Sequence, residues 1–552
     1  MDTHAPLPVR LLFVQTQTGN RTREVRICRT RSLLFLSTLC TLLAGCGEVF
    51  HVPTIGGSVS STSNPLVAQY TVFARCQGQA MVEFGPDTAY GRSTSWYSLA
   101  GDYQKTTILV AGMRAATTYH MRALAQCFGN TITGADTTFT TGALPTAAPF
   151  PVLQVTRPDP PQPNSEGPGI ELIDTIAPTA GLMQLYFTDR DANPIWYYNV
   201  DAGYYPFTVK QLPNGHLLLS LTNTQQSPGS ILREVDLAGG TVREMSVDDL
   251  KQKAQTAGFD FVPGGYHHDL LPLDNGHLLV LVNCFKDFTD LPGYAGTITI
   301  QGDAVIDLDQ NWNTVWAWNS FDHLDVNRHL APSLSNNVLD WTHSNALVYS
   351  PNDGNILLSM RHQSWVLKLD YNNGAGTGNV LWRLGYQGDF ALSQGGLATN
   401  DPSVWFSFQH FPTVIGQNGS KTTLGVWDNG DYRVLDAGGG LLCNVPGPPD
   451  CYSRATVFQI DESSMVADLS WQYLPGYFSL WGGSEVQLAN GNIEFDLNAP
   501  VTGLAPNVAS EVQEVTQTST PELVWKMDIP APMFAYRAYR VPSLYPGVTW
   551  KY

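Results

Sequence analysis

The sequence predicts an all-β protein, in which a small β-sandwich domain precedes a β-propeller of six blades. Only 14% of the 552 residues are charged, whereas glycine, proline, tryptophan and tyrosine are abundant. This balance is typical of strand-rich and turn-rich proteins, because aromatic side chains suit pleated strands and glycine and proline suit tight turns. Short apolar runs between turn residues, and a hairpin pattern that recurs along most of the chain, support the same class.

Residues 1–45 have the features of an export signal. Several arginines precede an apolar run of about a dozen residues, which is too short to span a bilayer as a stable helix. The run ends in Leu43-Ala44-Gly45-Cys46, which resembles the lipobox of bacterial lipoproteins. The resemblance implies cleavage before Cys46 and acylation of this cysteine. The mature protein would then be periplasmic or at the cell surface, held to the membrane by lipid alone. A plain secretory signal with an incidental cysteine is the alternative.

Residues 46–145 are expected to form the sandwich. Short strand-like segments such as "LVAQYTVFARC" and "TTYHMRALAQC" alternate with turn residues, and the pattern resembles a fibronectin type III-like domain. Residues 146–170 are rich in proline and are interpreted as a linker or an extended strap.

Residues 171–552 repeat two kinds of hairpin in alternation. One kind carries a tryptophan in its second strand, as in "VIDLDQNWNTVWAWN". The other kind turns at Asn-Gly or Asp-Gly, as in "VKQLPNGHLLLSL" and "DLLPLDNGHLLVLV", because both central positions of a two-residue hairpin turn need positive φ. Each pair supplies four strands, and six such pairs predict a propeller of six blades. The last unit, near "MFAYRAYRVPSLYPG", is degenerate.

The cysteines fit an exported chain, in which disulfides form readily. Cys443 and Cys451 bracket a short loop rich in proline and glycine, and a disulfide between them is expected. Cys76 and Cys127 lie in the predicted sandwich and are expected to pair, which leaves Cys284 as a buried thiol. The cysteine spacing does not suggest a zinc site.

Polar residues recur at one place in successive Asn-Gly hairpins, immediately before the first strand. Equivalent positions in neighbouring blades lie on the same face of a propeller, so these side chains should converge near the central channel. In a tight hairpin His343 lies opposite Arg361 or His362, which brings Arg361 to the same face. The residues concerned are His267, His268, His343, Asn345, His410 and Ser484.

Residues of these types can support two kinds of chemistry. Three imidazoles with Asp269 could bind a metal ion, but the fixed charge of Arg361 would repel it. A guanidinium with several histidines suits an anion such as sulfate, phosphate or carboxylate. We therefore expect no metal and no cofactor. His216 and His277 follow turn glycines and are interpreted as turn residues, and His362 is expected to point to the other side of its strand.

The chain resembles the bacterial arylsulfate sulfotransferases, which are periplasmic and use no nucleotide donor. The matching features are "HHDLLPL", "DWTHSNA" followed by "RHQS", and "FQHFPT", together with the propeller pattern. The resemblance implies transfer of a sulfuryl group from an aryl sulfate to a phenol by a ping-pong mechanism through a sulfohistidine. It implies that His410 is the nucleophile and that His343, Asn345 and Arg361 bind the sulfuryl oxygens.

The same resemblance implies a proton donor to the departing phenolate, for which His268 is preferred over His267. Ser484 is a weak counterpart of the family's pocket threonine. The family also has a disulfide near its active site, a role that Cys443 and Cys451 fit.

The net charge indicates which classes of partner are excluded. The formal net charge is −18, which argues against a nucleic-acid partner. A homodimer is compatible with the sequence. A ligand-binding surface propeller without activity, and a metal-dependent hydrolase that uses the histidines, are the competing functions.

Overall fold

The computed structural model describes most of the chain from residue 55 onward. The described ranges are 55–100, 105–160, 166–176, 182–223, 229–330, 333–335, 337–434, 443, 451–498, 500–502 and 507–550. The predicted signal segment and Cys46 lie outside these residues. Strands dominate the described residues, which contain one α-helix, α1 (Val247–Thr256), so the predicted all-β class is confirmed. No helix in these ranges is long and apolar enough to cross a membrane.

The described residues between 55 and 140 form two antiparallel sheets. Strand β2 alternates strictly between buried and half-buried residues, which is the pattern of a sheet with one face against a core. A disulfide joins Cys76 to Cys127, as expected. One sheet has the order β1-β2-β6, and the other β4-β3-β7-β8 with β5 on β3 and β9 on β7. The bounds are β1 (Ile55–Ser61), β2 (Ala68–Ala74), β3 (Gln77–Gly85), β4 (Arg92–Ser93), β5 (Tyr97–Ala100), β6 (Lys105–Val110), β7 (Thr118–Cys127), β8 (Asn130–Thr133) and β9 (Thr137–Thr140).

From residue 170 the described chain forms six sheets that each contain a four-stranded antiparallel path. The first three are β40 (Phe534–Val541), β11 (Ile170–Ile176), β12 (Leu185–Thr188) and β13 (Pro194–Tyr198); β14 (Tyr205–Gln211), β15 (Leu217–Thr222), β16 (Ser230–Val235) and β17 (Thr241–Ser246); and β18 (Pro263–Pro272), β19 (Leu278–Thr289), β20 (Thr297–Leu308) and β21 (Thr314–Asn319).

The other three are β24 (Ser344–Ser350), β25 (Asn355–Met360), β26 (Trp365–Leu369) and β27 (Val380–Gly385); β30 (His410–Asn418), β31 (Lys421–Asp428), β32 (Arg454–Asp461) and β33 (Val466–Tyr473); and β35 (Ser484–Gln487), β36 (Ile493–Asn498), β38 (Val508–Val515) and β39 (Leu523–Pro530). Additions are β10 (Gln154–Thr156) on β39, β22 (Ser333–Ser335) and β23 (Val338–Asp340) by β20, β28 (Ala391–Gln394) and β29 (Leu397–Ala398) by β33, and the pair β34 (Phe478–Ser479) and β37 (Pro500–Thr502).

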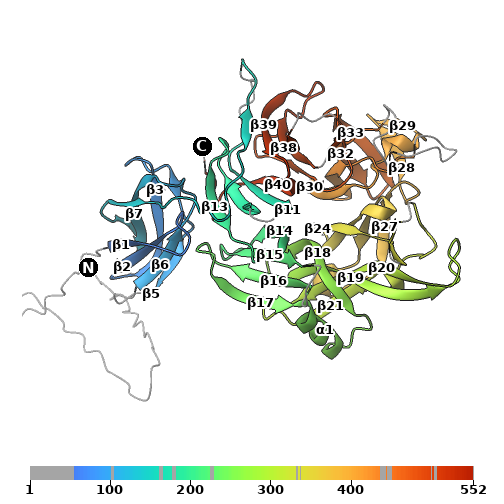
Figure 1. Ribbon diagram of the computed structural model, residues 1–552, viewed down its shortest axis with the longest axis horizontal. Coiled ribbons are helices and arrows are strands. Elements are labelled where there is room, and N and C mark those ends of the chain that lie inside the picture. Colours follow the sequence, from blue (N-terminus) through green and yellow to red (C-terminus); the bar gives the residue numbers. More distant parts are fainter. Residues whose placement is uncertain are drawn as a thin grey trace, which may run out of the picture. The chain divides into compact units, whose positions relative to one another are not determined.

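The first strands of these sheets contact one another in sequence. β14 contacts β18, β18 contacts β24, β24 contacts β30, β30 contacts β35 and β35 contacts β40, while β11 beside β40 contacts β14. Figure 1 shows β11, β14, β18, β24, β30 and β40 around the middle of this part of the chain. We interpret the six sheets as the blades of the predicted propeller, closed by the pairing of the C-terminal strand β40 with β11.

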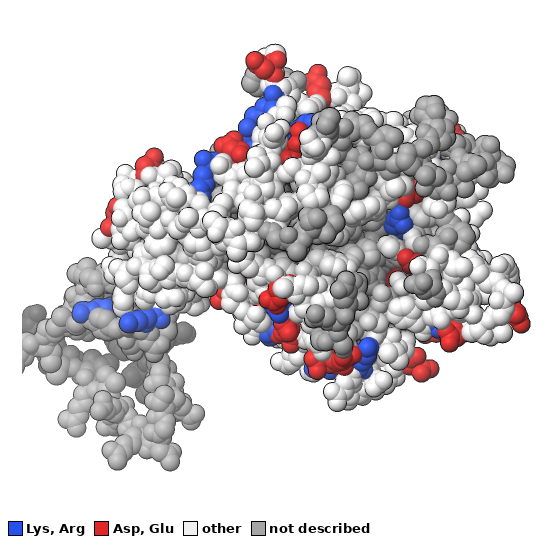
Figure 2. All heavy atoms as spheres, viewed as in Figure 1, with Lys and Arg blue, Asp and Glu red and all other residues white. Residues whose placement is uncertain are grey.

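The apolar core lies between neighbouring sheets. Leu218 and Leu232 of the second sheet pack with Val280 and Ile306 of the third, and all four are fully buried. The helix α1 follows the second sheet, and its N-cap is Ser246, whose side chain forms a capping box with that of Asp249. Part of the predicted linker, β10, adds a strand to the sixth sheet. Figure 2 shows sparse charged side chains of both signs on the viewed face, most of which is neutral.

Candidate active site

The predicted polar positions meet at one end of the inner strands. His268 lies in β18, His343 immediately precedes β24, and His410 begins β30. The ring centroids of His268 and His343 are 4.8 Å apart. The ring centroid of Tyr536 is 5.6 Å from that of His268 and 6.3 Å from that of His410. We use the term histidine cluster for His267, His268, His343, His362 and His410 together with Arg361 and Tyr536.

Irregular backbone aims these side chains. φ is +53° at His268 and +49° at His343, and it is also positive at Phe408 and Phe411 on either side of His410. Positive φ is uncommon outside glycine and gathers at functional sites. The pairing register shifts next to His268 and next to His410, and such bulges change the direction of a side chain.

His410 is held as one neutral tautomer. The amide nitrogen of Asn429 donates to the carbonyls of Ser479 and Gly482, at 3.0 and 3.1 Å. Its Oδ1 therefore faces Nδ1 of His410, 2.7 Å away, and Nδ1 must carry the proton. The Gly482 amide donates to Nε2 over 3.3 Å, so Nε2 has the lone pair. Burial, with the charge of Arg361, lowers the pKa of His410 well below its ordinary value.

Arg361 brings a fixed positive charge beside His410. Its backbone amide donates to the carbonyl of His343, as the hairpin register predicts. Its Nη2 donates to Asp431 at 2.6 Å and to the carbonyl of Leu480 at 2.8 Å. Its Nε is buried without a partner in the described residues. Burial raises the pKa of Asp431 to about 7 even though Arg361 is adjacent, so this ion pair is not fixed near neutral pH.

His362 does not point away from the cluster, and that expectation is wrong. The chain turns into a 3-10 segment, Arg361–Gln363, so the strand alternation ends before His362. Its ring centroid is 4.5 Å from that of His343. Its Nδ1 donates to the carbonyl of Asp340 at 2.8 Å, and its Nε2 accepts from Arg361 at 2.7 Å.

The metal alternative meets a competing set of hydrogen bonds. One potential ligand atom from each of Asp340, His343 and His362 lies within 4.8 Å of the others. However, Nδ1 of His343 is 2.5 Å from Asp340, and both ring nitrogens of His362 have partners. A metal ion here would displace these bonds and lie beside the guanidinium of Arg361. The arrangement suits an anion better than a cation.

The remaining predicted residues lie around the cluster in different ways. His267 forms a hydrogen bond with His268, and their Nδ1 atoms are 2.7 Å apart. Asn345 is fully buried and donates to the carbonyl of Gln409, which directly precedes His410. Ser484 is also fully buried, and its hydroxyl contacts Asp496 and the carbonyl of Ala538. None of these contacts of Ser484 reaches a histidine.

Four residues next to the predicted ones were not found from the sequence. Asn429 and Asp431 lie in "WDNGD" after β31, where a run of polar residues ending a buried strand was the available signal. Tyr536 and Arg537 lie in β40, in the segment that was interpreted as degenerate. Arg537 is fully buried, donates to Asp269 at 3.0 Å, and lies 4.2 Å from the centroid of the Phe411 ring.

A family model decides the identification. The model of arylsulfotransferase (ASST) matches residues 160–537. The chain belongs to the arylsulfotransferase family. Among curated proteins, the arylsulfate sulfotransferase AssT of Escherichia coli O6:H1 (strain CFT073) is 28% identical over 154 residues. This match spans 24% of the chain and 23% of that protein, so less than a quarter of either length is compared.

Solved structures add little to the arylsulfotransferase assignment. A protein of unknown function from Bacteroides caccae is 12% identical, covers 56% of this chain and 94% of its own, and has a TM-score of 0.24. Dihydro-heme d1 dehydrogenase NirN is 11% identical, covers 70% of this chain and 80% of its own, and has a TM-score of 0.29. At these TM-scores neither likeness carries an argument.

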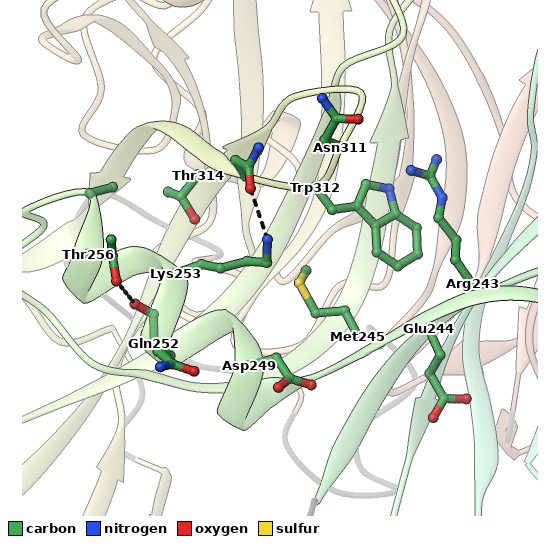
Figure 3. A pocket seen from close by; sticks show the side chains of 12 residues that line it. Arg243, Glu244, Met245, Asp249, Gln252, Lys253, Thr256, Asn311, Trp312 and Thr314 are labelled. Atoms are coloured by element: carbon green, nitrogen blue, oxygen red, sulfur yellow. Dashed lines mark hydrogen bonds between the residues drawn. The ribbon is translucent and has the colours of Figure 1, made fainter.

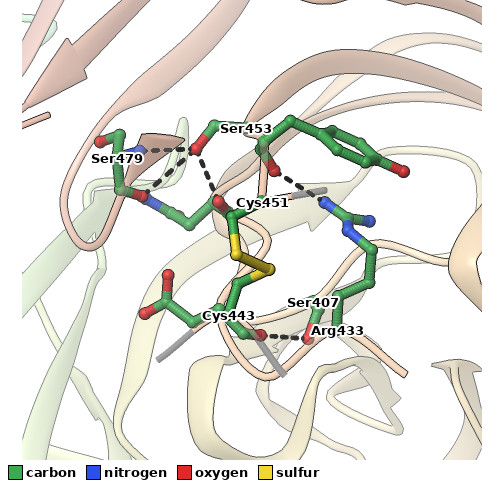
Figure 4. The surroundings of a disulfide bond; sticks show 9 residues. Ser407, Arg433, Cys443, Cys451, Ser453 and Ser479 are labelled. Atoms are coloured by element: carbon green, nitrogen blue, oxygen red, sulfur yellow. Dashed lines mark hydrogen bonds between the residues drawn. A yellow bond between two sulfur atoms is a disulfide. The ribbon is translucent and has the colours of Figure 1, made fainter. Parts of the chain in front are cut away.

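The second disulfide lies near the residues that hold His410 in place. Cys443 is bonded to Cys451, as expected. Ser453, two residues later, donates to the carbonyl of Asn429 at 2.6 Å and accepts from the amide of Ser479 at 2.8 Å. Figure 4 shows this network beside the disulfide. The disulfide therefore lies two residues from Ser453, which bonds to Asn429, the hydrogen-bond partner of His410.

A separate groove of about 750 Å³ lies between β17, α1 and the turn before β21. Figure 3 shows Arg243, Lys253 and Trp312 on its walls. The guanidinium of Arg243 lies 4.2 Å from the Trp312 ring centroid, and Lys253 donates to Asn313. The groove shares no residue with the histidine cluster.

Proposed function

We propose that this protein is an aryl-sulfate sulfotransferase that moves a sulfuryl group from an aryl sulfate donor to a phenolic acceptor. The observation that carries the proposal is the state of His410, a buried neutral imidazole whose Nε2 holds a lone pair while Asn429 accepts from Nδ1. An imidazole in this form is a nucleophile, and Arg361 beside it suits the negative oxygens of sulfate.

The first half-reaction forms a sulfohistidine. Nε2 of His410 attacks sulfur, the bond from sulfur to the aryl oxygen breaks, and a nitrogen–sulfur bond forms. Negative charge then builds on the sulfuryl oxygens and on the leaving oxygen. Arg361, His343 and Asn345 stabilise the charge on the sulfuryl oxygens. His268 enters this step as the imidazolium formed when the acceptor phenol of the preceding turnover gave up its proton, and it gives that proton to the leaving oxygen. As in phosphoryl transfer, positioning and positive charge supply most of the catalysis.

The second half-reaction reverses these roles. An acceptor phenol gives its proton to His268, its oxygen bonds to sulfur, and the nitrogen–sulfur bond breaks. The kinetics are therefore ping-pong, and no nucleotide or metal takes part. The ring of Phe207, half-buried and 4.5 Å from His268, offers an aromatic surface for the phenol.

Location and assembly follow from the sequence alone. The lipobox-like segment supports export and anchoring through Cys46, in the periplasm or at the cell surface. Export also agrees with two disulfides in the described residues. A homodimer and a lipid anchor remain predictions, which mass spectrometry of the mature N-terminus and sedimentation of the purified protein would test.

The test is a donor and acceptor assay with His410→Ala. The wild-type protein is expected to release 4-nitrophenol from 4-nitrophenyl sulfate without added nucleotide, and to carry one SO₃ group on His410 when the acceptor is omitted. His410→Ala is expected to abolish both, whereas His216→Gln, in a turn beside Glu234, is expected to keep both. Full activity of His410→Ala, or SO₃ on another residue, would contradict the assignment.

A further inference from the structure

We propose that Asp303 and His267 form a proton relay behind His268, which sets the tautomer of His268 and supports its change of charge in both half-reactions. The proposal rests on the proposed function, because it assigns a partner to the proton carrier of that reaction. His267 and Asp303 are positioning residues in this scheme, since neither needs to touch the substrate.

The two histidines share one hydrogen bond. Their Nδ1 atoms are 2.7 Å apart, so one Nδ1 donates and the other accepts. A neutral imidazole has one donor and one acceptor nitrogen, and therefore the nitrogen that remains on each ring is fixed as soon as one tautomer is known. Which of the two Nδ1 atoms donates therefore depends on whether Nε2 of His267 carries a proton.

Asp303 fixes the tautomer of His267. Nε2 of His267 lies 3.2 Å from Oδ1 of Asp303, which is within ion-pair distance, and neither atom has a hydrogen-bond partner of regular geometry in the described part of the chain, so each is available to the other. Although burial acts to raise the pKa of Asp303, the adjacent His267 and the hydrogen bonds from Thr342 and Ser344 lower that pKa below its ordinary value. The carboxylate thus accepts, and Nε2 of His267 carries the proton.

These proton positions determine the state of Nε2 of His268, the nitrogen that would meet the substrate. Nδ1 of His267 has the lone pair, so Nδ1 of His268 donates to it, and Nε2 of His268 is left with a lone pair. That nitrogen can take the proton of an acceptor phenol. After it does so, His268 is an imidazolium whose Nδ1 proton is shared with His267, which in turn donates to the carboxylate of Asp303.

Asp303 is built to hold this position. It is 1% exposed, and its Oδ2 accepts from the Thr342 hydroxyl at 2.7 Å and from the Ser344 amide at 2.5 Å. The carboxylate comes from β20 of the third sheet, and both donors lie where the fourth sheet begins. The relay is needed because burial and the nearby charges of other histidines and Arg537 lower the pKa of His268 and oppose its imidazolium form.

The relay predicts a dependence on the leaving group. Phenyl sulfate releases a poor leaving group, a phenolate whose conjugate acid has a pKa of about 10, and needs a proton from His268. The nitro group of 4-nitrophenyl sulfate stabilises its phenolate and weakens this need. In His267→Asn and in Asp303→Asn, the single-turnover rate with phenyl sulfate is expected to fall by about 100-fold, while the rate with 4-nitrophenyl sulfate falls by less than about tenfold.

The measurement is the single-turnover rate with phenyl sulfate divided by the single-turnover rate with 4-nitrophenyl sulfate. Both donors meet the same active molecules, so the ratio does not depend on how much of a variant is folded. The matched control is His277→Asn, which cuts another histidine–aspartate contact, to Asp307 at 3.0 Å in a turn, and should leave the ratio unchanged. If neither relay variant folds, Thr342→Val, which deletes one bond to Asp303, should lower the ratio by a smaller factor.

The outcomes separate this proposal from the proposed function. A lower ratio in the relay variants with an unchanged ratio in His277→Asn supports the relay. An unchanged ratio in every folded relay variant overturns it, provided that the wild-type protein carries SO₃ on His410. A wild-type protein that never carries SO₃ on His410 overturns the proposed function, and the relay with it.

Discussion

Asn429→Ala is expected to slow the attack of His410 on the donor. The substitution removes the acceptor of a 2.7 Å hydrogen bond to a side chain that is 1% exposed. Nδ1 of His410 would then be a buried donor without a partner, which costs about 1–3 kcal/mol. The imidazole can avoid this cost by moving its proton to Nε2, where the lone pair of the nucleophile is lost.

Either response lowers the population of the reactive tautomer. Since 1.4 kcal/mol corresponds to a factor of ten, the rate of the first half-reaction should fall about 5- to 150-fold. Rapid mixing with 4-nitrophenyl sulfate, followed by the absorbance of nitrophenolate, measures this rate as a burst. The amount released in the burst counts the active sites, so a loss of folded protein lowers the amplitude and not the rate constant.

Asn355→Ala is the control for the loss of a buried amide. Asn355 is 8% exposed, and its Oδ1 accepts from the backbone amides of Tyr371 and Asn372 in the turn region of the fourth sheet. We expect a lower melting temperature and an unchanged burst rate for this variant. A burst rate of Asn429→Ala equal to that of the wild type would refute the tautomer reasoning.

Three further outcomes are expected. Arg361→Lys, which keeps the charge but loses the planar donor group, should lower kcat/KM by about 100-fold in a steady-state assay. Burial raises the pKa of Asp496 from 3.8 to about 8, so the folded state binds its proton more tightly than the unfolded chain. Its contribution to stability is therefore largest below pH 3.8 and declines as the pH rises to about 8. Denaturant titrations should show a smaller loss over this range in Asp496→Asn. Prolonged dialysis against EDTA should leave sulfuryl transfer unchanged, and a loss restored by a divalent metal would favour the metal alternative.

The sequence predicted the parts of the molecule that repeat. Asn-Gly and Asp-Gly turns marked hairpins such as β14–β15 and β18–β19, because those turns require residues that tolerate positive φ. The positions of His268, His343 and His410 followed, since each lies at nearly the same distance from the turn of its own hairpin. The backbone bond between Arg361 and His343 followed from hairpin register alone.

The sequence did not predict the parts that depend on distant or irregular pairing. Tyr536 and Arg537 lie beside the cluster because β40 pairs with β11, a strand that comes far earlier in the sequence. No local sequence pattern predicts a pairing between strands so far apart. His362 was misplaced because a 3-10 turn interrupts the alternation on which its orientation was based. Asn429 lies in an irregular segment, where strand periodicity makes no statement about side-chain direction.

The histidine cluster combines several imidazoles with the guanidinium group of Arg361, and the guanidinium of Arg537 contributes to the field at His410. Burial, with the charge of neighbouring groups, lowers the pKa of His268 and His410 well below the ordinary value and that of His362 to about 3. The positive charges of Arg361 and Arg537 contribute to the lowered pKa of His410. A site that bound sulfate with protonated histidines would lose its nucleophile through the same protonation. The division of roles between arginine and histidine is therefore a requirement of attack by His410, and it explains why the fixed charges lie next to the imidazole that must remain neutral.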